Sequence, residues 1–233
     1  MIDSYVALDV ETTGLNPKLD KIIEIGMVRV RAGEIAAEFE TFVNPGRALE
    51  ERITELTGIR DEQLADAPDI SEVISETLQF IGGDILVGHG ILFDYSFVKR
   101  AAVNKRFVFE KEGIDTLRLA KAFLPELQSR SLPFLCHYYE IEHNAHRALP
   151  DAKAASELYR KLAMLFYRGN ETAFEPNRLL YQAKRETPIT IPQKEQLYKL
   201  LDRHKLTVDY QVEKLTRNEA GRIIARLLAE YGR

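Results

Sequence analysis

A short stretch near the start of the chain, residues 8–14 (LDVETTG), most constrains what this sequence can fold into. It follows an apolar, β-prone run, and residues two apart on a strand point to the same side. Asp9 and Glu11 therefore present two carboxylates together, while Leu8 and Val10 face a core. Two neighbouring acids on a half-buried strand repel each other. The pattern therefore predicts a bound cation, and a hard divalent metal ion is the natural candidate.

Two further stretches follow in order, residues 88–94 (GHGILFD) and residues 146–151 (HRALPD). Together the three stretches resemble the motifs of the DEDD superfamily of 3′→5′ exonucleases, in the DEDDh version whose third motif carries a histidine. The resemblance covers about the first three-quarters of the chain and extends to the proofreading epsilon subunit of bacterial DNA polymerase III. One position departs from the family pattern, because Gly90 stands where the family commonly has asparagine.

The resemblance implies a role for each motif residue. Two divalent ions, Mg²⁺ or Mn²⁺, would be held by four carboxylates, those of Asp9, Glu11, Asp94 and Asp151. Such a pair neutralises charge on a phosphoryl group and stabilises the leaving oxygen. His146 would be the general base, since histidine titrates near neutral pH. The terminal nucleotide would contact Thr12, Thr13 and Leu15.

Each motif residue also has an ordinary structural explanation. Asp94 and Asp151 alone would be acids in the first turn of a helix, where they suit the helix dipole. The two threonines would only form the turn, and Asp115 is expected to cap a helix rather than bind metal. The remaining histidines are expected to be surface or core residues: His89, His137, His143 and His204. For the acids, the joint pattern outweighs these explanations.

The expected fold is α/β, a ribonuclease H-like exonuclease domain followed by a small helical hairpin. Strands are expected at 21–30, 34–43 and 85–87, and helices at 70–81, 93–103, 116–124, 132–139 and 150–168. Asp69 with Glu72, and Thr216 with Glu219, have the spacing of capping boxes. The expected boundaries are 1–170 for the exonuclease domain, 171–191 for a linker, and 192–233 for the hairpin.

Composition limits the setting of the protein. One cysteine in 233 residues excludes an internal disulfide and suits a reducing cytoplasm. No long apolar run or basic leader is present, which predicts a cytoplasmic protein without membrane contact. The net charge is −4, but acids outnumber bases in residues 1–170 and bases outnumber acids in 171–233. The acidic part alone is not expected to bind nucleic acid tightly.

The sequence thus predicts a metal-dependent 3′→5′ exonuclease that releases nucleoside 5′-monophosphates from single-stranded 3′ ends, most plausibly of DNA, in proofreading or repair. The alternatives are an exoribonuclease resembling oligoribonuclease, and a catalytically silent nucleic-acid-binding scaffold. The intact set of four acids and a histidine argues against the scaffold. The final helices are too short to be stable alone, so they are expected to pack on each other or on the catalytic core. They would hold nucleic acid or bind a protein partner such as a polymerase.

Overall fold

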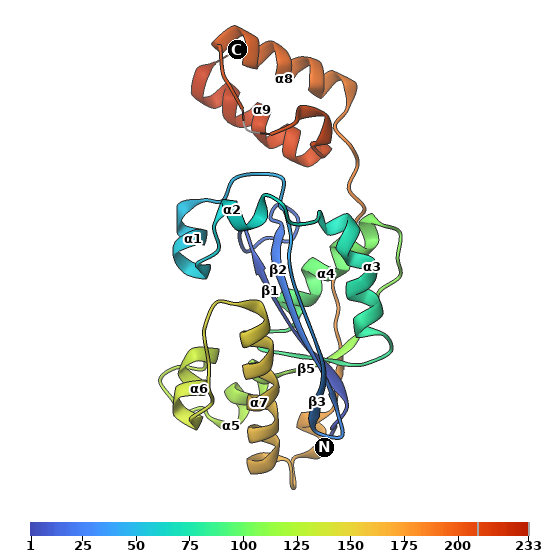
Figure 1. Ribbon diagram of the computed structural model, residues 1–233, viewed down its shortest axis with the longest axis vertical. Helices are drawn as coiled ribbons and strands as arrows, with labels where there is room; N and C mark the ends of the chain where they lie inside the picture. Colours follow the sequence, from blue (N-terminus) through green and yellow to red (C-terminus); the bar gives the residue numbers. More distant parts are fainter. Residues whose placement is uncertain (209, 233) are drawn as a thin grey trace. The chain divides into compact units, whose positions relative to one another are not determined.

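The computed structural model describes residues 1–208 and 210–232, and the chain divides into two compact units (Figure 1). The first comprises residues 1–45 and 49–183, and the second residues 184–233 with 46–48. Asp209 and Arg233, which belong to the expected hairpin module, lie outside the described residues. Within the described part of the chain, no helix is both long and apolar enough to cross a membrane.

A mixed sheet forms the centre of the first unit, and over the described residues it has six strands in the order β3-β2-β1-β4-β5-β6. The strands are β1 (Tyr5–Thr12), β2 (Ile22–Arg31), β3 (Glu34–Phe42), β4 (Leu86–Gly88), β5 (Glu112–Asp115) and β6 (Asn177–Arg178). β1 is antiparallel to β2 and parallel to β4. The expected meander of the first three strands is confirmed, whereas β5 and β6 were not foreseen.

Helices cover both faces of the sheet, which confirms the α/β class (Figure 1). Along β1, Tyr5 and Ala7 belong to one apolar cluster with α5 to α7, while Leu8 and Val10 belong to another with α3 and α4. The helices of this unit are α1 (Glu51–Thr57), α2 (Asp61–Leu64), α3 (Ile70–Ile81), α4 (Leu92–Asn104), α5 (Thr116–Phe123), α6 (Leu132–Tyr139), α7 (Ala148–Phe166) and the 3₁₀ helix η1 (Glu171–Phe174).

Local signals placed several helix starts correctly. Asp69 accepts from the Ser71 N–H at 2.7 Å while Glu72 accepts from the Asp69 N–H at 2.9 Å, so the capping box of α3 is present as expected. α7 begins earlier than expected, at Ala148, so Pro150 is its third residue. Proline is tolerated there because N–H groups in the first turn have no partner within the helix.

The expected linker at 171–191 is wrong over its first part. Phe174 and Leu179 are buried in the two clusters of the first unit, and β6 pairs with β5. Residues 171–183 therefore complete the first unit rather than leave it. Sequence periodicity could not show this, because a strand of two residues has no period to detect.

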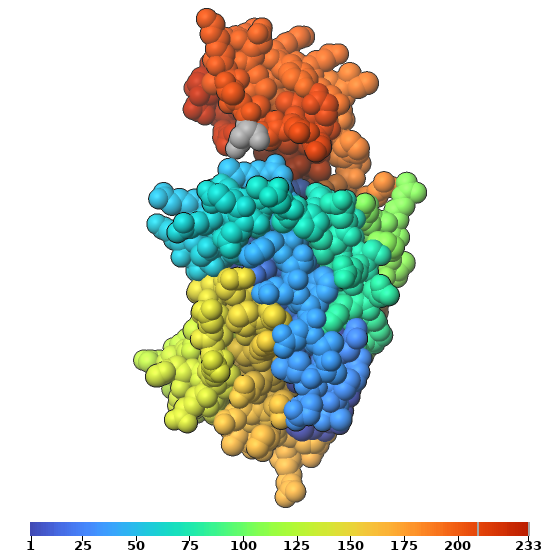
Figure 2. Space-filling model, viewed as in Figure 1, coloured from blue at the N-terminus to red at the C-terminus, as the bar shows by residue number. Residues whose placement is uncertain are grey.

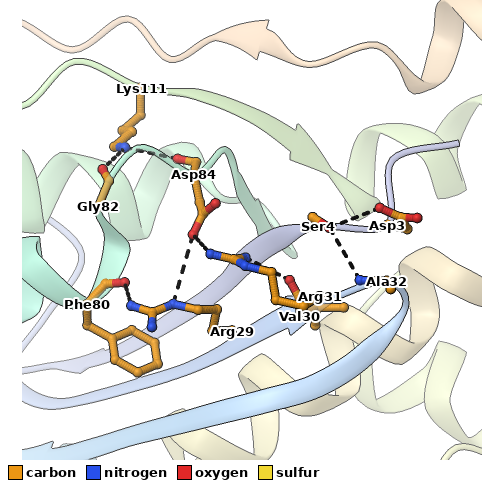
Figure 3. Close-up of polar contacts among 10 residues, drawn as sticks. All are labelled: Asp3, Ser4, Arg29, Val30, Arg31, Ala32, Phe80, Gly82, Asp84 and Lys111. Carbon is orange, nitrogen blue, oxygen red and sulfur yellow. Dashed lines mark hydrogen bonds and ion pairs between the residues drawn. The ribbon is translucent and has the colours of Figure 1, made fainter.

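Polar contacts tie β2, β4 and β5 together at the end of the sheet where β4 and β5 begin (Figure 3). Arg31 Nη2 lies 2.6 Å from Asp84 Oδ2, and the Arg29 guanidinium lies 4.0 Å from the same oxygen. Lys111 Nζ donates to the Asp84 carbonyl at 2.9 Å. The carboxyl ends of β1 and β4, where the motif acids lie, are at the opposite end.

The second unit has a core of its own. α8 (Ile191–His204) and α9 (Arg217–Tyr231), with the 3₁₀ helix η2 (Val212–Lys214) between them, share a cluster that includes Leu197, Leu201, Ile224 and Leu227. The expected packing of the two helices on each other is confirmed. The capping box of α9 is present too, since Thr216 accepts from the Glu219 N–H at 3.2 Å.

Candidate active site

β1 carries the first two acids to the face of the sheet that α7 covers. Leu8 and Val10 point to the other face and are buried at 0% and 4% exposure, as the alternation of a strand requires. Asp9 pairs in register with Gly26, and Glu11 with Glu24. Asp9 and Glu11 therefore point to the same side of β1, beside positions 26 and 24 of β2, and both are half-buried.

Asp151 completes a group of three carboxylates. Among the described residues, ligand atoms of Asp9, Glu11 and Asp151 lie within 4.8 Å of one another. Asp151 is in the first turn of α7, is 8% exposed, and accepts from the His146 N–H at 3.1 Å. Three converging carboxylates form a hard oxygen donor set of the kind that divalent cations prefer. This group can therefore hold a divalent metal ion.

Asp94 lies at the start of α4 and stands apart from that group. Its carboxylate accepts from the Val10 N–H at 3.1 Å, and the side chain is buried. It is close enough to Asp9 to raise the pKa of that acid. Of the four predicted metal ligands, the structure thus brings three together, and a backbone N–H of β1 binds the fourth, Asp94, on α4.

The electrostatics of the site favour a bound cation. Burial raises the pKa of Asp9 well above its usual range, and the neighbouring charges of Asp94, Asp151 and Glu11 add to the effect. Burial also raises the pKa of Glu11 to about 8, with Asp151 and Glu24 adding to the shift and Arg147 opposing it. Without a bound cation, ionised carboxylates in this site are poorly hydrated and repel one another.

The two histidines before α7 have different surroundings. His143 was expected to be an ordinary surface or core residue, but its Nε2 contacts Asp151 Oδ1. Its side chain is only 7% exposed. His146, the predicted general base, is exposed and has a φ of 65°, which is uncommon for a residue other than glycine. The spacing of the motif could not reveal which imidazole faces the acids, because it depends on the path of the loop.

Glu24 and Arg147 connect β2 to the start of α7 next to the three acids. The sequence did not predict this role for either residue. Glu24 is fully buried and accepts from Arg147 Nε at 3.0 Å, Arg147 Nη2 at 2.7 Å and the Ala148 N–H at 2.9 Å. The Ala148 contact satisfies a free N–H of the helix start with a carboxylate. An acid within the otherwise apolar run of β2 was the available signal, because such a residue requires a partner.

Arg147 also reaches β3, which adjoins α7 on the surface drawn in Figure 2. Its Nη2 lies 3.7 Å from a carboxylate oxygen of Glu40, and its guanidinium lies over the ring of Phe42, 5.3 Å from the centroid. Further along α7, Lys153 Nζ lies 2.8 Å from Glu38 Oε2. Residue 147 is therefore fixed by β2 and β3 together.

Gly26 lets the start of α7 rest directly on β2. A Cβ atom at this position would lie 2.1 Å from the carbonyl carbon of Ala148 and 2.1 Å from the Leu149 nitrogen. No side chain fits at such a distance, so the two backbones touch. Because Gly26 is also the register partner of Asp9, the same strand position faces both the first acid and the helix that carries the last one.

The turn after β1 contains the residues predicted to contact a nucleotide. Thr12 Oγ1 donates to the Gly14 carbonyl at 2.7 Å, and Thr13 Oγ1 accepts from the Lys21 N–H at 3.0 Å. Both threonines are buried, whereas the Leu15 side chain is 85% exposed. The hydroxyls thus form the turn, which presents Leu15 at the surface. Their role toward a nucleotide stays a prediction.

Residues around the second motif have structural roles. Asp115 Oδ1 accepts from the Leu117 N–H at 2.9 Å, so its expected role as a helix cap is confirmed. The same oxygen accepts from the Gly90 N–H at 2.8 Å. Gly90 has a φ of 84°, in the left-handed region that favours glycine. His89 contacts Thr116 and the Arg130 carbonyl through its two ring nitrogens, in line with the expected structural role.

The family described as RNase_T exonuclease matches residues 6–159, which include all three motifs. The chain belongs to this exonuclease family. The predicted family and the ribonuclease H-like exonuclease fold are therefore confirmed, and the chain is an exonuclease whose acidic cluster suits the divalent metal ions of the family.

A similar curated relative is the DNA polymerase III PolC-type of Oceanobacillus iheyensis, 38% identical over 231 residues. That match covers 93% of this chain but only 16% of the relative. Among solved structures, Exonuclease X with 5′ overhanging duplex DNA shares the fold with a TM-score of 0.57 and 24% identity, over 70% of this chain and 92% of that one. The nuclease domain of 3′hExo, a DEDDh family member bound to rAMP, has a TM-score of 0.60 and 21% identity, over 75% and 96%.

Proposed function

We propose that this exonuclease hydrolyses phosphodiester bonds at single-stranded 3′ ends of DNA and releases nucleoside 5′-monophosphates. The observation that carries the proposal is the convergence of Asp9, Glu11 and Asp151 within 4.8 Å, with Asp94 held beside them by the Val10 N–H. Mg²⁺ or Mn²⁺ ions bound there would supply neutralisation of phosphate charge and an acidified water.

The protein's own groups would then position the reactants. Asp9, Glu11, Asp94 and Asp151 would hold the cations, and the His146 imidazole would take the proton of the attacking water. In the structure the His146 backbone N–H bonds to Asp151, so the base is tied to the last acid through the main chain. Thr12, Thr13 and the exposed Leu15 would contact the terminal nucleotide.

DNA is favoured over RNA because relatives that match the chain bear the name DNA polymerase III PolC-type. These relatives also support a proofreading or repair role beside a polymerase, and hence a cytoplasmic setting. The alternative is a 3′→5′ exoribonuclease resembling oligoribonuclease, which the rAMP bound to 3′hExo keeps open. A silent scaffold is disfavoured because every predicted acid and His146 are present.

The test is a time course on single strands of DNA and RNA labelled at the 5′ end, with Mg²⁺, with Mn²⁺ and with chelator. The proposal expects a ladder that shortens from the 3′ end of DNA only when metal is present. Blunt duplex should be cut more slowly, since fraying the end pair costs about a few kcal/mol. Cutting of a circular strand would indicate an endonuclease, and faster loss of RNA would favour the alternative.

A further inference from the structure

The second unit carries a groove that the proposed active site does not use. The groove has a volume of about 350 Å³ and lies between α8 and α9. Its lining consists of Gln196, Lys199, Leu200, Arg203 and Leu228. Residues three and four apart share one side of a helix, so α8 contributes one continuous stripe in which two cations flank an apolar floor.

The two cations of the groove are exposed, whereas two acids of the same unit already form hydrogen bonds. Among the described residues, neither Lys199 nor Arg203 forms an ion pair, and both are exposed. By contrast, Glu213 accepts from the Tyr198 hydroxyl and Glu219 caps α9. Both cations of the groove can therefore reach a phosphate, although α8 also carries Glu195 and Asp202.

We propose that this groove binds the phosphate backbone of a single-stranded nucleic acid, so that the second unit holds the strand on which the first unit acts. The inference rests on the proposed function, because that function supplies a polyanionic strand. Lys199 and Arg203 match phosphate charge, and Leu200 and Leu228 offer an apolar surface to sugars and bases. The acidic balance of residues 1–170 favours a separate basic contact for the strand.

The test measures binding of a long fluorescein-labelled oligothymidylate to the full chain by anisotropy, with metal chelated so that the strand is not cut. Lys199→Gln/Arg203→Gln removes two proposed phosphate contacts. The slope of log affinity against log salt should become shallower by about 1.4. Between about 50 and 200 mM salt, the parent should lose roughly sevenfold more affinity than the variant.

Lys214→Gln/Arg217→Gln is the matched control, since it removes two exposed cations of the same unit that do not line the groove. It should keep the parental slope. Melting temperatures and circular dichroism check that both variants are folded. An unchanged slope in the groove variant, or an equal change in the control, would overturn the proposal. Groove-dependent binding of labelled poly-glutamate without binding of DNA would overturn it in favour of an acidic protein segment.

The same preparation separates this inference from the proposed function. Strand shortening from the 3′ end by the parent with metal tests the active site alone. Salt-dependent groove binding without strand shortening would remove the proposed function and leave a nucleic-acid-binding groove. Shortening without groove-dependent binding would leave the function and remove the groove.

Discussion

Replacing Glu24 by glutamine should loosen the start of α7 while keeping the shape of the side chain. The buried carboxylate accepts from Arg147 at 3.0 and 2.7 Å and from the Ala148 N–H at 2.9 Å, and an amide offers only one oxygen to these donors. Breaking a buried pair costs about 3–5 kcal/mol. The Arg147 side chain is 34% exposed and also approaches Glu40, so water and a second acid retain part of its stabilisation. We therefore expect a loss of about 2–3 kcal/mol, which lowers the melting temperature by about 5–10 °C.

Activity should fall further than stability alone explains. Ala148 lies between His146 and Asp151, so a shift of the helix start moves both, and about 1 Å of misplacement can cost about 10²-fold in rate. The assay combines thermal unfolding, strand shortening at a temperature where the variant is folded, and metal binding by calorimetry. Metal affinity should weaken because Asp151 moves away from Asp9.

Two comparisons decide whether the reasoning holds. Lys153→Gln breaks an exposed ion pair on the same helix, in which the side chains are 41% and 44% exposed, and should cost less than about 1 kcal/mol. A double-mutant cycle of Glu24→Gln with Arg147→Gln should show coupling, because each residue contacts the other. A Glu24→Gln protein with parental stability and metal affinity would refute the argument, as would additive effects of the two changes.

Three further outcomes follow from the site. Asp9→Ala should abolish metal-dependent activity yet raise the melting temperature of the metal-free protein, because it relieves repulsion among buried acids; a variant as active as the parent would contradict this. Because the pKa of Glu11 is raised to about 8 in the folded state, the folded protein binds more protons than the unfolded chain. The contribution of Glu11 to the stability of the metal-free protein should therefore be largest below about pH 4.5 and fall as the pH rises to about 8. Thermal unfolding across this range should show a flatter profile for Glu11→Gln. His146→Ala should lower kcat by about 10²–10⁴-fold with little change in metal affinity, and His143→Ala measured in parallel shows which imidazole is the base.

Local chemistry in the sequence predicted much of this structure. Asp69 with Glu72 marked the start of α3 because both halves of a capping box lie within four residues. The resemblance to the exonuclease motifs predicted that Asp9 and Asp151 share one metal site, and the two residues do lie together although they are far apart in sequence. β5 was missed because its four residues include two acids and a glycine, so neither alternation nor propensity marks it as a strand. It is a strand because β4 and β6 pair with it.

The supporting residues of the site were harder to predict than the acids themselves. The role of Glu24 can be recognised only when β2 is known to lie beneath α7. That contact joins positions far apart in sequence, so the sequence does not show it. His143 and His146 differ by three positions in one loop, and their directions depend on a left-handed residue. Side-chain direction in such a loop is set by its tertiary surroundings, which residue type and spacing do not encode.

Gly26 makes the distance between the first and last acids a property of the main chain. Side chains between a sheet and a helix can change rotamer and absorb a substitution, but two backbones already in contact at Gly26 and Ala148 cannot. Substitutions in the apolar core elsewhere should therefore change how readily the protein unfolds while leaving its affinity for metal nearly constant. Gly26→Ala adds only one methyl group, but this group should push the start of α7 away from β2. The carboxylates of Asp9 and Asp151 should then move apart, although the methyl group contacts neither of them.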